Sequence, residues 1–122
     1  MANQTIENPG LMYISTAQTY AQQSTCLKRQ VGCVVVKDEE VIAYGFNHGY
    51  VEECTCSLES KNPNVLHAEV MALQGHCIDY IGAHIYITHP PCNNCQELIK
   101  QKQIKAVTYI NRSGHVETYT LY

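Results

Sequence analysis

Four side chains with the chemistry of a hydrolytic metal site lie in two short segments of the sequence. The first segment reads HAE from His67 to Glu69, and the second reads PCNNC from Pro91 to Cys95. One imidazole and two thiolates, those of His67, Cys92 and Cys95, supply three ligands to a tetrahedral zinc ion and leave its fourth position for water. A zinc ion held in this way activates water for hydrolysis at neutral pH.

The spacing of these residues also fits an open, catalytic zinc site. Cys92 and Cys95 are three positions apart, so one helical turn places both sulfurs on the same side. The N-terminus of a helix supplies backbone N–H groups and a positive dipole end that stabilise thiolates. Glu69 follows His67 by two positions and can reach the water without binding the metal. We therefore predict one catalytic zinc, with Glu69 as the general acid and base.

Each of these residues has an ordinary alternative when it is considered alone. His67 can be a core or helix-start histidine, Glu69 a solvated acid, and the two cysteines half of a structural zinc knuckle or a redox pair. An HxE segment followed by PCxxC, with a strand between them, is a much stronger signal than either part. A non-catalytic, zinc-stabilised binding module is the alternative from another class. Glu69 argues against that module, because a purely structural site has no use for a carboxylate beside an open position.

The elements that position these residues follow from the apolar periodicity and the turn residues. We expect helices over residues 8–23, 66–76 and 92–102, and strands over residues 32–37, 41–46, 83–88, 106–110 and 116–121. The inner stripe of the second helix is expected at Val70, Leu73 and Cys77, and residues 48–65 are expected to form an irregular loop. Strands that alternate with helices after an opening hairpin indicate an α/β fold, a three-layer α/β/α sandwich in one domain over residues 1–122.

The composition favours a small substrate over a polymer. The chain has 122 residues, 45% of them apolar, and a formal net charge of −3. Binding to a long polyanion depends on neutralising many phosphates, so this charge disfavours a polynucleotide partner. A single nucleotide phosphate needs only a local cluster of donors, and the net charge does not exclude it.

The cysteine content indicates metal ligands or buried thiols. There are seven cysteines, an odd number, and the N-terminal MANQTIENPG lacks the basic-then-apolar pattern of a secretion signal. A disulfide framework is therefore not expected. No stretch reaches the length of a membrane span. We expect a cytoplasmic protein without a membrane partner.

From Cys26 to Ile110 the chain resembles the deoxycytidylate deaminases of the cytidine deaminase superfamily. The matching stretches are STCLKRQVGCVVVK, VIAYGFN, LHAEVMAL and YITHPPCNNCQELIKQKQIKAVTY. The resemblance implies a mixed five-stranded sheet flanked by helices, with zinc held between two helix N-termini. It implies hydrolytic deamination of deoxycytidine monophosphate (dCMP) to dUMP, with His67, Cys92 and Cys95 as zinc ligands and Glu69 as the proton shuttle.

The same resemblance implies four substrate-binding residues. Asn47 would hydrogen-bond the sugar 3′-hydroxyl, and the backbone N–H of Ala68 would meet the pyrimidine carbonyl. Arg29 would lie near the substrate phosphate, and Tyr109 would line the base or sugar pocket. The ordinary alternatives are a turn residue for Asn47, a solvated loop cation for Arg29 and a packed strand residue for Tyr109.

Two departures from the family pattern bear on regulation and substrate contacts. The family has Asn-Gly, a small residue and proline where this chain has Asn47-His48-Gly49-Tyr50, in a loop tied to effector contacts. Activation by dCTP and inhibition by dTTP are therefore not carried over. The chain is also short after Tyr109. Cytidine, dCTP, a modified cytosine nucleotide and a base within RNA are the alternative substrates, and the STCLKRQVG segment favours the monophosphate.

The resemblance further implies a homo-oligomer, since members of the family commonly form hexamers, and a small sheet with a long loop gains burial by association. It also raises the question of a second, structural zinc, which some phage members have. Its ligands here would be Cys26, Cys54 and Cys56, with either His76 or Cys77 as the fourth. Ordinary loop and buried thiols are the alternative.

Overall fold

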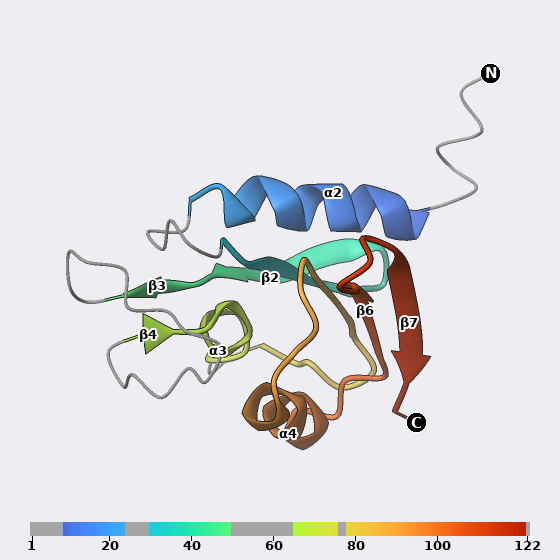
Figure 1. Cartoon of the computed structure of the whole chain (residues 1–122). Coiled ribbons are helices and arrows are strands. Elements are labelled where there is room, and N and C mark those ends of the chain that lie inside the picture. Colours follow the sequence, from blue (N-terminus) through green and yellow to red (C-terminus); the bar gives the residue numbers. More distant parts are fainter. Residues whose placement is uncertain (1–8, 24–29, 50–64, 76–77, 122) are drawn as a thin grey trace.

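A mixed five-stranded sheet forms the centre of the protein (Figure 1). The computed structural model describes residues 9–23, 30–49, 65–75 and 78–121. The strands of this sheet are β1 (Gly32–Lys37), β2 (Glu40–Phe46), β5 (His84–Ile87), β6 (Ala106–Ile110) and β7 (Val116–Thr120). They are ordered β2-β1-β5-β6-β7, with β5 and β6 parallel and the other neighbours antiparallel. This arrangement confirms the mixed sheet that the resemblance implied.

Helices cover both faces of the sheet. Helix α2 (Pro9–Ala21) lies on one face, whereas α3 (Ala68–Ala72) and α4 (Asn93–Gln101) lie on the other (Figure 1). The three-layer α/β/α arrangement expected from the sequence is therefore confirmed. Within the described ranges, every helix is too short or too polar to cross a membrane.

The apolar run of β1 supplies both cores because its side chains alternate between the two faces. The core beneath α2 contains Ile14, Ala17, Val34, Val36 and Tyr86. The core beneath α3 and α4 includes Cys33, Val35, Ala68, Ile87 and Ile99. A strand buried on both faces reads as a continuous apolar run, which explains the sequence GCVVVK.

The predicted helix over residues 66–76 is wrong at both ends. Leu66 belongs to β4 (Val65–Leu66), which pairs with β3 (His48–Gly49), so the expected loop over residues 48–65 begins and ends in paired strands. At the other end α3 stops at Ala72, where the Tyr80 hydroxyl donates to the Ala72 carbonyl at 2.7 Å and accepts the Gly75 N–H at 3.1 Å. Both causes are contacts with residues outside the predicted helix.

The inner stripe predicted for this helix is only partly correct. Leu73 is buried, as expected, but Val70 is half-buried, and the inward positions of α3 are Ala68, Glu69 and Ala72. Cys77 lies outside the described residues. A helix of five residues presents one turn rather than a long stripe.

The predicted bounds of β1 and β6 agree with the structure, and those of the remaining predicted elements differ by one or two residues. The first helix ends at Ala21 rather than near Gln23, and β2 begins at Glu40. The hairpin turn consists of Asp38 and Glu39, whose φ angles are 54° and 67°. Two consecutive positive φ angles are the geometry of a type I′ turn, which matches the twist of the two strands.

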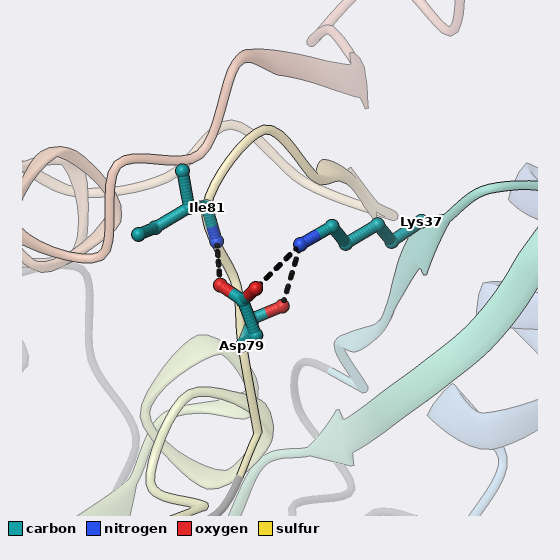
Figure 2. A network of polar contacts seen from close by, with 3 residues as sticks. All are labelled: Lys37, Asp79 and Ile81. Atoms are coloured by element: carbon teal, nitrogen blue, oxygen red, sulfur yellow. Dashed lines mark hydrogen bonds and ion pairs between the residues drawn. The ribbon is translucent and has the colours of Figure 1, made fainter.

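An ion pair ties the end of β1 to the segment that leads into β5. The Lys37 ammonium lies 2.9 Å from an Asp79 carboxylate oxygen and donates to the Asp79 carbonyl at 3.4 Å (Figure 2). The other carboxylate oxygen accepts the Ile81 N–H at 3.1 Å. The hydrogen bond from Lys37 lowers the pKa of Asp79. Because the pair is exposed, it orients this segment more than it stabilises the fold.

Gly45 allows β2 to approach the first turn of α3 closely. A Cβ at this position would lie 2.1 Å from the Ala68 carbonyl oxygen and 2.8 Å from the Ala72 nitrogen. We expect Gly45→Ala to push α3 away and to lower the free energy of unfolding by about 1–3 kcal/mol, the usual cost of overpacking. Thermal unfolding measures this effect. Gly82→Asn is the control, since Gly82 has open space and a φ of 79° that Asn tolerates; equal stabilities of the two variants would contradict the close approach.

Candidate active site

The predicted metal ligands lie at the start of the two helices on one face of the sheet. His67 is the N-cap of α3 and Cys92 is the N-cap of α4. Both have extended backbones, with ψ angles of 152° and 171°, and their carbonyls accept the first helical hydrogen bonds from Met71 and Gln96. Helix α3 therefore begins directly after the ligand His67, and α4 begins directly after the ligand Cys92.

The three ligand atoms converge as a tetrahedral zinc site requires. The donor atoms of His67, Cys92 and Cys95 all lie within 4.8 Å of one another. His67 Nδ1 lies 3.7 Å from the Cys92 sulfur and 3.4 Å from the Cys95 sulfur. Zinc–nitrogen and zinc–sulfur bonds of normal length place such atoms about 3.5 Å apart at a tetrahedral angle. The residues present therefore fit a zinc ion with three protein ligands.

The environment of Cys95 also fits a cation. Its side chain is 2% exposed, and burial, followed by the negative charge of Glu69, raises the pKa of the thiol well above its ordinary value. A thiolate at this position needs a positive partner, and metal binding supplies one by displacing the proton. The nearby N-terminus of α4 contributes in the same direction.

Glu69 is a buried carboxyl group beside the ligands. It lies in the first turn of α3 with 4% exposure, and burial raises its pKa, although a hydrogen bond with the Cys95 side chain acts in the opposite direction. A buried carboxyl is rare without a polar or charged partner. Its position, adjacent to Cys95 and outside the ligand set, suits a group that exchanges protons at the metal centre.

The backbone between His67 and Glu69 is held from the sheet side. Ala68 is fully buried, and its carbonyl accepts a hydrogen bond from the Cys33 thiol at 3.3 Å. Gly45 lies against the same carbonyl. The contact with Cys33 was not predicted, because a buried cysteine in an apolar strand gives no sequence signal beyond core packing. The contact of the Ala68 N–H with a pyrimidine carbonyl stays a prediction.

Asn47 is buried at the end of β2 and joins it to the residue before β1. Its Oδ1 accepts the Val31 N–H at 2.9 Å, and its own N–H donates to the Val31 carbonyl at 3.1 Å. The amide oxygen therefore accepts one hydrogen bond within the protein. Thr88, directly after β5, holds the first residue of β1 in a similar way. Its N–H donates to the Gly32 carbonyl at 3.0 Å, and its hydroxyl oxygen accepts the Gly32 N–H at 3.1 Å. Thr88 was not singled out from the sequence.

Tyr109 lies near the end of β6 and has a partner within the protein. Its hydroxyl donates to Glu117 Oε1 at 2.7 Å, and its ring packs against the core beneath α3 and α4. Tyr109 is therefore a packed strand residue, and it lies on the face of the sheet that is covered by the two helices bearing the predicted ligands. Glu117 is another residue that sequence reasoning missed, because its partner is set by strand pairing.

Several predicted residues lie outside the described part of the chain. They are Arg29, predicted to lie near the phosphate, and the proposed second set of metal ligands, Cys26, Cys54, Cys56, His76 and Cys77. Among the described residues, His67, Cys92 and Cys95 are the metal-binding group.

Comparison with known proteins places the chain in a family. The family model for the cytidine and deoxycytidylate deaminase zinc-binding region matches residues 10–111. The deoxycytidylate deaminase of Mycobacterium phage D29 is 34% identical over 120 residues, which cover 83% of this chain and 93% of the phage protein. The human deoxycytidylate deaminase is 30% identical over 116 residues, covering 84% of this chain and 65% of the human protein.

A solved structure agrees with these sequence relatives. The dCMP deaminase of the cyanophage S-TIM5, in complex with dCMP and dUMP, superposes with a TM-score of 0.73 at 33% identity and covers 91% of this chain and 84% of the phage chain. This similarity confirms the cytidine deaminase-like fold. The chain therefore belongs to the zinc-dependent cytidine and deoxycytidylate deaminases.

Proposed function

We propose that the protein hydrolyses dCMP to dUMP and ammonia. The observation that carries this proposal is the convergence of His67, Cys92 and Cys95 within 4.8 Å, with the buried Glu69 beside Cys95. The names of the phage and human relatives and the dCMP and dUMP bound to the cyanophage enzyme support dCMP as the substrate.

His67, Cys92 and Cys95 would hold the zinc ion and leave one position open. Zinc bound there would act as a Lewis acid and would lower the pKa of its bound water to about 7. Glu69 takes a proton from the attacking water and delivers it to the ring nitrogen as the oxygen adds to the amino-bearing carbon. Glu69 then takes the remaining proton from the added hydroxyl group and passes it to the amino nitrogen, so that the carbon–nitrogen bond breaks, ammonia leaves and the carbonyl of uracil forms. Burial keeps this carboxyl group able to hold a proton between the steps.

Four residues would bind the rest of the nucleotide. The Ala68 N–H meets the pyrimidine carbonyl, and its fixed backbone supports this role. Asn47 binds the sugar 3′-hydroxyl, supported by its burial and its hold on Val31. Tyr109 lines the base or sugar pocket from β6. Arg29 pairs with the phosphate, as the family motif indicates.

Ammonia release from a panel of cytosine compounds tests the substrate. We expect the highest kcat/KM for dCMP and a lower value for deoxycytidine, cytidine, dCTP and a cytosine-containing RNA oligonucleotide, because the phosphate and the deoxyribose are both recognised. Equal turnover of deoxycytidine and dCMP would remove phosphate recognition from the proposal. Preference for dCTP or a modified nucleotide would replace dCMP as the substrate.

The protein is also proposed to form a homo-oligomer, with a hexamer as the family's common form. Three large apolar side chains, Leu11, Met12 and Ile81, are 50%, 52% and 56% exposed, which supports burial by association. Light scattering at micromolar concentration should give a multiple of the 13.7 kDa chain mass. A mass of one chain would contradict the proposal.

The organisation and location of the protein follow from the same chemistry. We infer one catalytic domain over residues 1–122 that binds a nucleotide rather than a polynucleotide or a membrane. Thiolate ligands persist in a reducing compartment, which supports a cytoplasmic location.

A second zinc at Cys26, Cys54 and Cys56 is decided by metal quantification. One zinc per folded chain excludes the second site, whereas two zinc ions that fall to one in Cys54→Ser support it.

A further inference from the structure

The carboxylate of Glu117 on β7 accepts two short hydrogen bonds from β6 and the turn that follows it. The Tyr109 hydroxyl donates to Oε1 at 2.7 Å, and the Asn111 amide donates to Oε2 at 2.8 Å. Asn111 is itself fixed, because its Oδ1 accepts the N–H groups of Ser113 and His115 at 2.9 Å. Glu117 therefore joins the hairpin turn to Tyr109, and the proposed mechanism gives it no role.

The register of the sheet places Tyr109 on the same face and at the same edge as the metal ligands. Tyr109 pairs with Ile87 of the parallel neighbour β5, and paired residues on adjacent strands point to the same face. Ile87 is buried in the core that contains Ala68. The carboxyl ends of β5 and β6 lie at one edge, and β5 leads within five residues to Cys92.

A second tyrosine packs beside Tyr109 on the neighbouring strand. Tyr119 on β7 packs edge-on against Tyr109, with ring centroids 6.0 Å apart.

We propose that Glu117 is a positioning residue for nucleotide binding, which acts by fixing the direction of the Tyr109 hydroxyl proton. This inference rests on the proposed function. A phenol that donates its only proton to a carboxylate offers a lone pair to any third group. Tyr109 therefore accepts a hydrogen bond from a donor group of the nucleotide. It does not serve as a phosphate ligand, because phosphate oxygens are acceptors and the carboxylate repels them.

Four variants separate this role from a structural one. Glu117→Thr removes both acceptor oxygens and keeps a residue suited to strands, whereas Glu117→Gln keeps one carbonyl oxygen for Tyr109. Tyr109→Phe removes the hydroxyl, and the double variant Tyr109→Phe/Glu117→Thr completes a cycle. Glu40→Thr is the matched control, since Glu40 is an exposed glutamate on β2, at the opposite edge of the sheet.

We expect Glu117→Thr to raise KM for dCMP by about threefold to tenfold, with kcat within about twofold, as loss of one binding hydrogen bond does. Glu117→Gln should recover most of the loss. Tyr109→Phe should show a similar rise in KM, and the double variant should be no worse than Tyr109→Phe. Glu40→Thr should match the wild type, and thermal unfolding should show that every variant folds.

The Kd of the product dUMP, measured by calorimetry in the same variants, gives a readout that does not depend on turnover. An unchanged KM and Kd in Glu117→Thr would overturn the proposal, as would effects of Glu117→Thr and Tyr109→Phe that multiply in the double variant. If the wild type binds dUMP but does not convert dCMP, the proposed function is contradicted. The role of Glu117 is then decided by the Kd of dUMP in the single and double variants.

Discussion

Replacing Glu69 with alanine is expected to lower kcat for dCMP by about a hundredfold to ten-thousandfold while zinc stays bound. The reason is that Glu69 exchanges protons at successive steps, and a general acid–base group typically contributes an effect of this size. None of the three ligands is altered, so zinc occupancy should be unchanged. Because an ionised carboxyl group is costly to bury, the variant should unfold at a temperature no lower than the wild type.

Steady-state kinetics, zinc quantification and thermal unfolding on the same samples test this expectation. Glu69→Gln is a second variant that keeps the size of the side chain and cannot take up a proton, so it should be equally impaired. Glu97→Ala, which removes an exposed acid of α4, is the matched control and should retain activity. Near-normal turnover in Glu69→Ala would contradict the proposed mechanism and would favour the alternative of a non-catalytic zinc-stabilised module.

Replacing Cys92 with serine is expected to abolish tight zinc binding and to destabilise the protein. The site holds two helix N-termini together through three ligands, and loss of one thiolate removes a strong bond. In zinc-finger peptides, the apparent binding free energy of structural zinc is about 10–16 kcal/mol at neutral pH, and it is coupled to folding. Both zinc content and the unfolding temperature should therefore fall in this variant.

Cys33→Ala separates the loss of a ligand from the loss of a nearby thiol. Cys33 is buried beside Ala68 but lies outside the ligand group, so its variant should keep the zinc of the catalytic site. Metal analysis of the folded fraction decides the assignment. Full zinc occupancy in Cys92→Ser, or zinc loss in Cys33→Ala equal to that in Cys92→Ser, would contradict it.

The strands with the clearest apolar runs could be predicted to the residue. The bounds predicted for β1 and β6 agree with Gly32–Lys37 and Ala106–Ile110, because strands buried in the middle of a sheet carry continuous β-branched and apolar residues. The predicted helix over residues 66–76 failed because its true ends depend on Tyr80 and on the pairing of β3 with β4. The pairing of β3 with β4 joins segments distant in the sequence, and the contact with Tyr80 involves a residue outside the apolar pattern from which the helix was predicted.

The metal ligands could be predicted for a similar reason. The chemistry of His67, Cys92 and Cys95 constrains both residue type and spacing within short segments, and the structure brings their donor atoms together. Thr88 and Glu117 carry no such signal, since a threonine or glutamate in a strand is common. Thr88 binds Gly32, which is 56 positions away in the sequence, and the partner of Glu117 depends on the register of the β6–β7 hairpin.

Conversion of dCMP by the purified zinc protein tests the central claim most directly. The account predicts equal amounts of dUMP and ammonia, loss of the activity on removal of zinc with a chelator, and its return when zinc is added. Glu69→Ala, assayed in parallel, should form neither product at a comparable rate. Intact dCMP after incubation with folded protein that carries one zinc at His67, Cys92 and Cys95 would contradict the account.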